Sequence, residues 1–347
     1  MFIKITMVIV LLSPLYSLSQ ESKPPNIIMM IGDGMGLSQI SSGMYSNNNY
    51  TSVERSQHVG LIKTHSFDNL VTDSAAAGTA MSSGVKTYNR VVGMDEKYSP
   101  VKTILEICRD KGYMTAIIAT STIVHATPAS YYSKVKSRYN YDEIASQLSK
   151  SNINFFVGGG EKFFNDRRDK RNLMNEMNDY VFANSIESFK KINSNKIGFL
   201  TSYDSPLGKH EGRKPSLEDI LQVTIQKLTS FNKPFFLLVE GSQIDWGGHD
   251  NDSEHMISEM LEFDRTVEKV FNFANIDKNT TVIITADHET GGVAIIDGNI
   301  EDSKVVNKYV SKDHTATMVP IFSFGPYSSL FSGVYDNTEI FDKLEAI

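Results

Sequence analysis

Short runs of apolar residues recur along the chain and alternate with segments of helical periodicity. The runs occupy residues 26–31, 115–119, 155–157, 235–239, 281–285 and 318–324. Between the fourth and fifth runs, one helical stripe carries Met256, Ile257, Met260, Leu261, Val267 and Phe271. Strands that are apolar along their whole length are typical of a sheet buried on both faces. The alternation therefore predicts an α/β fold with a mostly parallel central sheet and helices on both faces.

Acidic residues and histidines come directly after three of these runs. They are Asp33 in NIIMMIGDGMG, Glu240, Asp245 and His249 in FFLLVEGSQIDWGGH, and Asp287 and His288 in TVIITADHETGG. Because ligands of open α/β sheets gather at the carboxyl ends of the strands, we expect these side chains to converge at one edge. Unpaired carboxylates would repel each other strongly in a partly buried place. Bound cations would remove that repulsion.

The types of these side chains favour particular metals. Histidine and carboxylate ligands without thiolates suit zinc at nitrogen-rich positions and magnesium at oxygen-rich ones. Asp245 and His249 are four residues apart and could reach one ion. The adjacent pair Asp287 and His288 is, taken alone, more typical of a turn or an ion pair. Two such pairs after apolar runs, together with His314 in KDHTATMVP, predict a metal site.

The stretch VTDSAAAGTA, residues 71–80, places an acid and a hydroxyl before a series of small residues. Two interpretations of this stretch remain open from the residues alone. Thr, Asp and Ser are good N-caps, and alanines extend a helix well. Alternatively, Ser74 is a nucleophile at a helix N-terminus, where backbone N–H groups favour an anion. The small neighbours would then leave room for a substrate and metal ions.

The first 19 residues have the layout of a secretory signal peptide. Lys4 precedes an apolar run that is too short for a comfortable membrane span and ends in SLS. We therefore predict removal of residues 1–19 and export to the periplasm or the medium, without a membrane anchor. The single cysteine, Cys108, excludes an intrachain disulfide in that oxidising compartment. The net charge of −7 gives no indication of nucleic-acid binding.

Residues 20–347 are predicted to form a single catalytic domain, in which the more charged and irregular segment 161–215 is a peripheral insertion. Six motifs follow one another in this region: GDGMG, TDSAAAGTA, HATPASYYSKVKSR, VEGSQIDWGGH, TADHETGG and DHTATMVP. In this order they resemble the alkaline phosphatase family, most of all its small exported bacterial members, including those of cold-adapted bacteria. The resemblance implies a three-layer sandwich, hydrolysis of small phosphate monoesters, two zinc ions, one magnesium ion and a homodimer.

The same resemblance implies roles for individual residues. Ser74 would be the nucleophile that becomes phosphoserine, and Arg138 would bind two phosphoryl oxygens with its planar fork. The metal ligands would form three sets: Asp245, His249 and His314 for the first zinc; Asp33, Asp287, His288 and Ser74 for the second zinc; Asp33, Thr127 and Glu240 for magnesium. Two zinc ions could then stabilise both the attacking and the leaving oxygen of an in-line displacement.

Two positions near this site depart from the best-known enterobacterial member of the family. That enzyme has an aspartate where His125 stands and a lysine where Trp246 stands. A neutral His125 gives the third metal position less negative charge and a nitrogen that suits zinc better than magnesium. We therefore expect weaker magnesium binding. Without the lysine charge at Trp246, we also expect product phosphate to leave more readily.

Two other interpretations of the sequence remain open. The first is a related enzyme on the same scaffold: a phosphodiesterase, a sulfatase or a metal-dependent phosphoglycerate mutase. The sequence SAAAG after Asp73 lacks the proline and arginine of the sulfatase pattern C/S-x-P-x-R. Related diesterases commonly use threonine as nucleophile, and the mutases are cytosolic, which the export signal opposes. The second is an exported protein that binds metal or phosphate without turnover.

Overall fold

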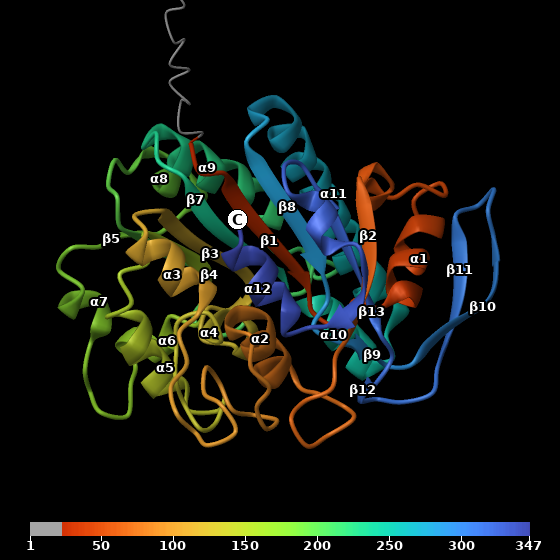
Figure 1. The fold of residues 1–347 in the computed structure, drawn as a ribbon, viewed down its shortest axis with the longest axis horizontal. Coiled ribbons are helices and arrows are strands. Elements are labelled where there is room, and N and C mark those ends of the chain that lie inside the picture. Colours follow the sequence, from red (N-terminus) through yellow and green to blue (C-terminus); the bar gives the residue numbers. More distant parts are fainter. Residues whose placement is uncertain (1–22) are drawn as a thin grey trace, which may run out of the picture.

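A ten-stranded sheet forms the centre of the molecule in a computed structural model that describes residues 23–347. The predicted signal peptide, residues 1–19, lies outside the described part. The strands of the sheet are β1 (Asn26–Gly32), β2 (His58–Lys63), β3 (Met114–Thr122), β4 (Phe155–Gly159), β5 (Val181–Ala183), β6 (Ile197–Leu200), β7 (Phe235–Gly241), β8 (Thr280–Thr285), β13 (Val319–Phe324) and β14 (Gly333–Asp336). Their order is β14-β2-β13-β8-β1-β7-β3-β4-β6-β5 (Figure 1). Strand β13 runs antiparallel to β8 and β2, and the other neighbouring pairs are parallel. The prediction of a mostly parallel sheet is confirmed.

Helices cover both faces of this sheet. The helices of at least seven residues are α1 (Leu37–Tyr45), α2 (Ser74–Ser83), α3 (Ile104–Asp110), α5 (Tyr141–Leu148), α9 (Leu217–Ser230), α10 (Gln243–Asp250), α11 (Ser253–Asp277) and α12 (Glu339–Glu345). Helices α9 and α11 pack together on one face, and α2, α3 and α12 pack together on the other (Figure 1). The apolar stripe predicted from the sequence lies on α11, where Met256, Met260, Val267 and Phe271 are buried. The three-layer architecture is therefore confirmed.

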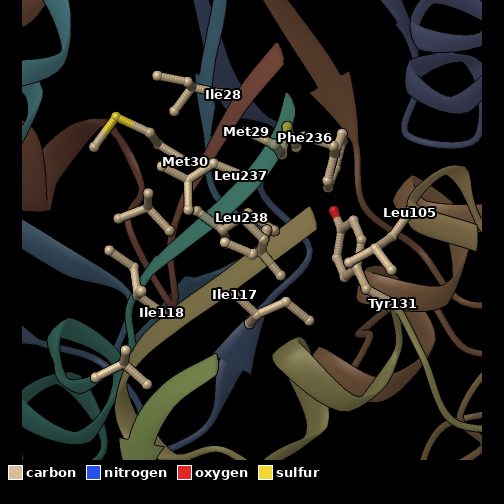
Figure 2. Packing of buried hydrophobic residues seen from close by; sticks show 14 of the residues in the cluster. Ile28, Met29, Met30, Leu105, Ile117, Ile118, Tyr131, Phe236, Leu237 and Leu238 are labelled. Atoms are coloured by element: carbon tan, nitrogen blue, oxygen red, sulfur yellow. The ribbon is translucent and has the colours of Figure 1, made fainter. Parts of the chain in front are cut away.

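The central strands are apolar along their length because both of their faces are buried. Every residue of β1, β3 and β7 is buried. Figure 2 shows Leu105 and Tyr131 beside Phe236 on one face of the sheet, and the rings of Tyr131 and Phe236 are 6.2 Å apart. Ile28 and Leu237, which are register partners, lie on the opposite face. Burying one such side chain contributes about 1.5–3 kcal/mol, so this core holds the central strands firmly in place.

The segment 161–215 lies at one edge of the sheet. It contributes β5 and β6, with the short helices α6 (Lys162–Asn165), α7 (Leu173–Glu176) and α8 (Ile186–Lys191) around them. The short strands β9 (Glu289–Thr290) and β12 (His314–Thr315) pair outside the main sheet, as do β10 (Val293–Asn299) and β11 (Lys304–Tyr309). Within residues 23–347, no helix combines the length and the apolarity that crossing a membrane requires.

Candidate active site

The predicted site residues lie at the carboxyl ends of β8, β1, β7 and β3, four neighbouring strands at the centre of the sheet. Asp33 follows β1, Glu240 is next to last in β7, and Asp287 follows β8 after one intervening residue. His125 and Thr127 lie just beyond β3, around the start of the short helix α4 (Ala126–Ala129). The convergence predicted from the apolar runs is confirmed, because parallel strands bring their carboxyl ends to one edge.

A first group of metal-type ligands is formed by Asp245, His249 and His314. Their ligand atoms lie within 4.8 Å of one another, and the two Nε2 atoms are 3.1 Å apart. The other ring nitrogens face backbone carbonyls, His314 Nδ1 at 2.8 Å from Thr72 O and His249 Nδ1 at 2.5 Å from Lys312 O. Nδ1 therefore carries the proton in each neutral ring, and Nε2 is left with a lone pair that can bind a cation.

A second group is centred on His288, which is fully buried. Ligand atoms of Asp33, Asp245 and His288 lie within 4.8 Å of one another. His288 Nε2 is 3.2 Å from Asp287 Oδ2 and 3.3 Å from Ser74 Oγ. The structure thus brings the predicted nucleophile next to the predicted second zinc set. Burial disfavours the charged ring, but the adjacent Asp287 carboxylate outweighs it, and the pKa of His288 is raised.

A third group contains Asp33, Glu240 and His125, whose ligand atoms also lie within 4.8 Å of one another. Thr127 Oγ1 is 3.5 Å from Asp33 Oδ2, so the three predicted magnesium ligands are close together. A ring nitrogen of His125 lies among them, so this residue is close enough to the third metal position to influence it. Burial, and then the Arg138 charge, lower the pKa of His125 to about 3, so its ring is neutral.

Buried atoms at these groups lack the partners that a metal-free protein would need. Asp33 Oδ1, Glu240 Oε1 and His125 Nδ1 are buried and have no hydrogen-bond partner among the described residues. Burial, followed by the charges of neighbouring carboxylates, raises the pKa of Asp33, and burial raises the pKa of Glu240 to about 7. Converging acidic oxygens without donors are the environment in which divalent cations bind, so the residues fit the implied ions.

Ser74 is the first residue of α2 and is 1% exposed. Asp73 caps this helix, because its Oδ1 accepts a hydrogen bond from the Ala76 N–H at 3.0 Å. Its Oδ2 accepts another from Arg138 Nη1 at 3.1 Å, while Arg138 Nη2 lies 3.3 Å from His125 Nε2. The capping interpretation of VTDSAAAGTA is therefore confirmed for Asp73. The same residue also holds Arg138 beside Ser74, a role that the sequence did not indicate.

Two further residues, Glu289 and Thr290, lie beside the candidate ligands although their role was not predicted from the sequence. Thr290 Oγ1 donates to Asp245 Oδ1 at 2.5 Å and lies 3.2 Å from His288 Nδ1, so it contacts both zinc-type groups. Next to it, the buried Glu289 carboxylate accepts from Gln39 Nε2 at 2.7 Å. Both residues follow His288 directly in TADHETGG, and this adjacency was the only signal of their role.

A cavity of about 1020 Å³ opens onto Ser74 and Arg138. Trp246 lines it, and its ring stands edge-on to the His125 ring with 6.2 Å between the centroids. Residues of the 88–90 and 138–141 segments also line the cavity: Tyr88, Asn89, Arg90, Tyr139 and Tyr141. Of the predicted site residues, seven line this cavity: Ser74, His125, Arg138, Asp245, Trp246, His249 and His314. The other five are fully buried: Asp33, Thr127, Glu240, Asp287 and His288.

The fold and the site define an α/β protein with a candidate three-metal centre around a buried serine at the carboxyl edge of its sheet. The chain belongs to the alkaline phosphatase family, because the model of the family described as "Alkaline phosphatase" matches residues 24–310.

Individual relatives agree with this assignment. The chain is 40% identical to alkaline phosphatase 4 of Bacillus subtilis (strain 168) over 78% of its own length and 62% of that protein, so it spans less than two thirds of this relative. It is 34% identical to alkaline phosphatase 3 of the same strain, over 91% of its length and 87% of that protein.

Solved structures place the chain near enzymes of cold-adapted bacteria. The alkaline phosphatase of the Antarctic bacterium TAB5 superposes with a TM-score of 0.89 at 39% identity, covering 93% of this chain and 98% of the other. Two TAB5 mutants, in which a histidine is replaced by glutamate or aspartate, have Mg bound in the M3 site. The cold-active enzyme of Shewanella sp. gives a TM-score of 0.85 at 26% identity, covering 92% of this chain and 99% of the other.

Proposed function

We propose that this chain is an alkaline phosphatase that hydrolyses small phosphate monoesters to an alcohol and inorganic phosphate through phosphoserine at Ser74. The observation that carries the proposal is the position of Ser74 Oγ, 3.3 Å from His288 Nε2, in the cavity that also contains Arg138. A nucleophile, a phosphate-binding fork and carboxylate–histidine groups within one cavity are the parts that phosphoryl transfer needs.

The roles of the chain's own residues follow from their positions. Ser74 Oγ attacks the phosphorus as the alcohol oxygen leaves, and water then attacks the same phosphorus and releases Ser74. Arg138, held by Asp73, donates two parallel hydrogen bonds to phosphoryl oxygens and keeps the group in line. The N-terminus of α2 adds its backbone N–H groups and dipole to the stabilisation of the phosphoryl charge.

Three ions complete the proposed site. Asp245, His249 and His314 would hold one zinc; Asp33, Asp287, His288 and Ser74 would hold the other; Asp33, Thr127 and Glu240 would hold magnesium. When bound, the zinc ions supply positive charge at the attacking and leaving oxygens. The orphaned oxygens of Asp33 and Glu240 support this assignment because cations would satisfy them. We also propose export after removal of residues 1–19 and assembly as a homodimer.

The test is an assay of metal-stripped protein with three substrates. Phenyl phosphate, diphenyl phosphate and phenyl sulfate are offered before and after zinc and magnesium are restored, separately and together. We expect turnover of phenyl phosphate only, and most of it when both metals are present. If the diester or the sulfate were cleaved faster than phenyl phosphate, the protein would be a related hydrolase and not a phosphomonoesterase. If the protein bound metal but hydrolysed none of the three esters, the interpretation as a binding protein without turnover would hold instead.

Arg138→Ala is expected to raise the KM for phenyl phosphate and the inhibition constant for free phosphate by about ten- to a hundredfold. The reason is the loss of a charged hydrogen-bonding partner, which costs about 1.5–3 kcal/mol. Steady-state kinetics with phosphate as inhibitor measures both constants. Lys97→Ala, which removes an exposed charge outside the cavity, is the control. If phosphate inhibition stayed the same in Arg138→Ala, this arginine would not bind the phosphoryl group.

His125→Asp, combined with Trp246→Lys, is expected to tighten magnesium binding about tenfold and to strengthen phosphate inhibition. The aspartate adds negative charge beside Asp33 and Glu240, and the lysine adds positive charge at the cavity wall. The TAB5 mutants support this expectation, because an acid in place of a histidine accompanies Mg in their M3 site. Magnesium titration of the two single variants and the double variant measures the effect. Unchanged affinity and inhibition would show that neither residue tunes the site.

A further inference from the structure

The turn formed by Asn89 and Arg90 is fastened directly to the segment that carries the nucleophile. Asn89 Nδ2 donates to Val71 O at 3.0 Å, and Asn89 Oδ1 accepts from the Asp73 N–H at 3.1 Å. The Arg90 N–H donates to Asp73 Oδ1 at 3.0 Å, and Arg90 O accepts from the Arg138 N–H at 2.7 Å. The backbone of Arg90 is thus held between the cap of the Ser74 helix and the phosphate-binding arginine.

Arg90 adopts a backbone conformation that its side chain disfavours. Its φ is +75°, in the left-handed region that glycine and asparagine occupy with less strain. The two hydrogen bonds that Arg90 makes in this turn use its backbone N–H and carbonyl alone, so glycine could make them equally well. A large charged side chain at such a position is therefore not explained by the folding of the turn.

The Arg90 side chain lies at the wall of the active-site cavity. The residue is exposed, and its guanidinium carbon is 5.9 Å from the centre of the Tyr139 ring. Arg138 also lines this cavity but is already engaged by Asp73 and His125, and its side chain is only 12% exposed. Arg90 remains exposed to solvent, in the same cavity as Arg138, the residue proposed to bind the transferred phosphoryl group.

Asp68 and Asp313 also line this cavity, so its lining is not uniformly positive. A general attraction of anions to the cavity therefore does not account for the presence of Arg90. The guanidinium fork matches the geometry of phosphate oxygens, and it can stack on an aromatic ring while it binds them. An exposed fork in the same cavity as Ser74 and Arg138 suits a leaving group that carries its own phosphate.

We propose that Arg90 is a specificity residue that binds a second phosphate on the leaving side of the substrate. The preferred substrates would then be phosphate esters and anhydrides whose leaving group is itself phosphorylated, such as nucleoside diphosphates. This inference rests on the proposed phosphatase activity and adds a preference to it. Ser74 attacks the terminal phosphorus of such a substrate, the bridging oxygen leaves with the inner phosphate, and Arg90 holds that inner phosphate.

The experiment compares kcat/KM for ADP and AMP, which share the nucleoside and differ in the second phosphate. In Arg90→Gly, which keeps the left-handed turn without strain, the ratio of ADP to AMP is expected to fall about tenfold. Arg90→Lys should restore part of the ratio at low salt, because it keeps the charge but loses the fork. The difference should shrink as salt is raised, because this contact is exposed.

Arg90→Asn and Lys97→Asn are the matched variants. Asparagine tolerates the left-handed conformation, so Arg90→Asn should lower the ratio as Arg90→Gly does, while the exposed Lys97, outside the cavity, should leave it unchanged. Melting curves of all variants establish that they fold. An unchanged ratio in folded Arg90→Gly and Arg90→Asn would overturn the inference and leave the phosphatase proposal intact. If the unmodified protein hydrolysed neither nucleotide nor phenyl phosphate, the phosphatase proposal would fail, and the preference with it.

Discussion

Ser74→Ala is expected to abolish covalent labelling of the protein by phosphate and to lower kcat by three or more orders of magnitude. Removing the nucleophile of an enzyme that works through a covalent intermediate eliminates the first chemical step. Residual turnover would remain, because metal ions held by the remaining ligands would supply an activated water as an alternative nucleophile. The measurement is acid-trapped incorporation of labelled phosphate, followed by peptide mapping and steady-state kinetics.

The control for this variant is Ser83→Ala. Ser83 is also buried on α2, but it lies at the far end of the helix and donates to Thr79 O at 2.7 Å. We expect Ser83→Ala to take up label like the unmodified protein. A label found at another residue would remove Ser74 from the role of nucleophile, whatever happened to the rate.

Removal of the metal ions is expected to eliminate turnover and to lower the melting temperature by about 5 °C or more for each zinc site. A ligand at a thousand times its Kd stabilises a protein by about 4 kcal/mol, which corresponds to several degrees for a chain of this size. Calorimetry before and after chelation, followed by stepwise return of zinc and magnesium, measures the change. A complete loss of metal and activity with no loss of stability would contradict the argument from crowded acids.

The metal-free protein is also expected to lose stability as the pH rises above about 6.5. Burial raises the pKa of Glu240 from 4.5 to about 7 and raises that of Asp33. The folded state therefore keeps a proton on Glu240 up to about pH 7, whereas the unfolded chain has already released it, so unfolding becomes easier as the pH rises through 7. The raised pKa of Asp33 acts in the same direction. His125 and His314 have lowered pKa values and oppose the trend only below 6.5, the ordinary value.

Urea denaturation of the chelated and metal-loaded protein between pH 6.5 and 8 separates the two states. In the loaded protein, the ions keep the carboxylates ionised, and we expect the decline to disappear. Parallel pH profiles would mean that these carboxylates are not where the ions bind.

The elements that the sequence predicted best are those whose residues are forced to be apolar. The central strands β1, β3, β7 and β8 are buried on both faces, so each appeared as a continuous run. The edge strands β5 and β14, and β2 beside β14, contain exposed residues and gave no such signal. Burial on both faces, rather than strand propensity, made the central strands recognisable in the sequence.

The residues of the candidate site also fall into a group that could be predicted from the sequence and a group that could not. Its acids and histidines could be predicted because each follows a buried strand directly, and the family resemblance sorted them into sets. Residues that act through tertiary contacts could not be predicted. Thr290 and Glu289 gain their role from contacts with Asp245 and Gln39, which are 45 and 250 positions away in the chain. The left-handed backbone of Arg90 depends on hydrogen bonds to Asp73 and Arg138, which are 17 and 48 positions away in the chain.

The attachment of the site to the four central strands also determines how the molecule can come apart. Amides in such strands exchange with solvent only when the whole domain opens, whereas edge segments open locally at a much smaller cost in free energy. Strand β5, which forms one edge of the sheet, can therefore fray without moving any of the candidate ligands. Local opening at this edge is therefore a separate event from disruption of the candidate active site. Because that site is attached to the central strands, heat inactivation should coincide with cooperative unfolding of the core.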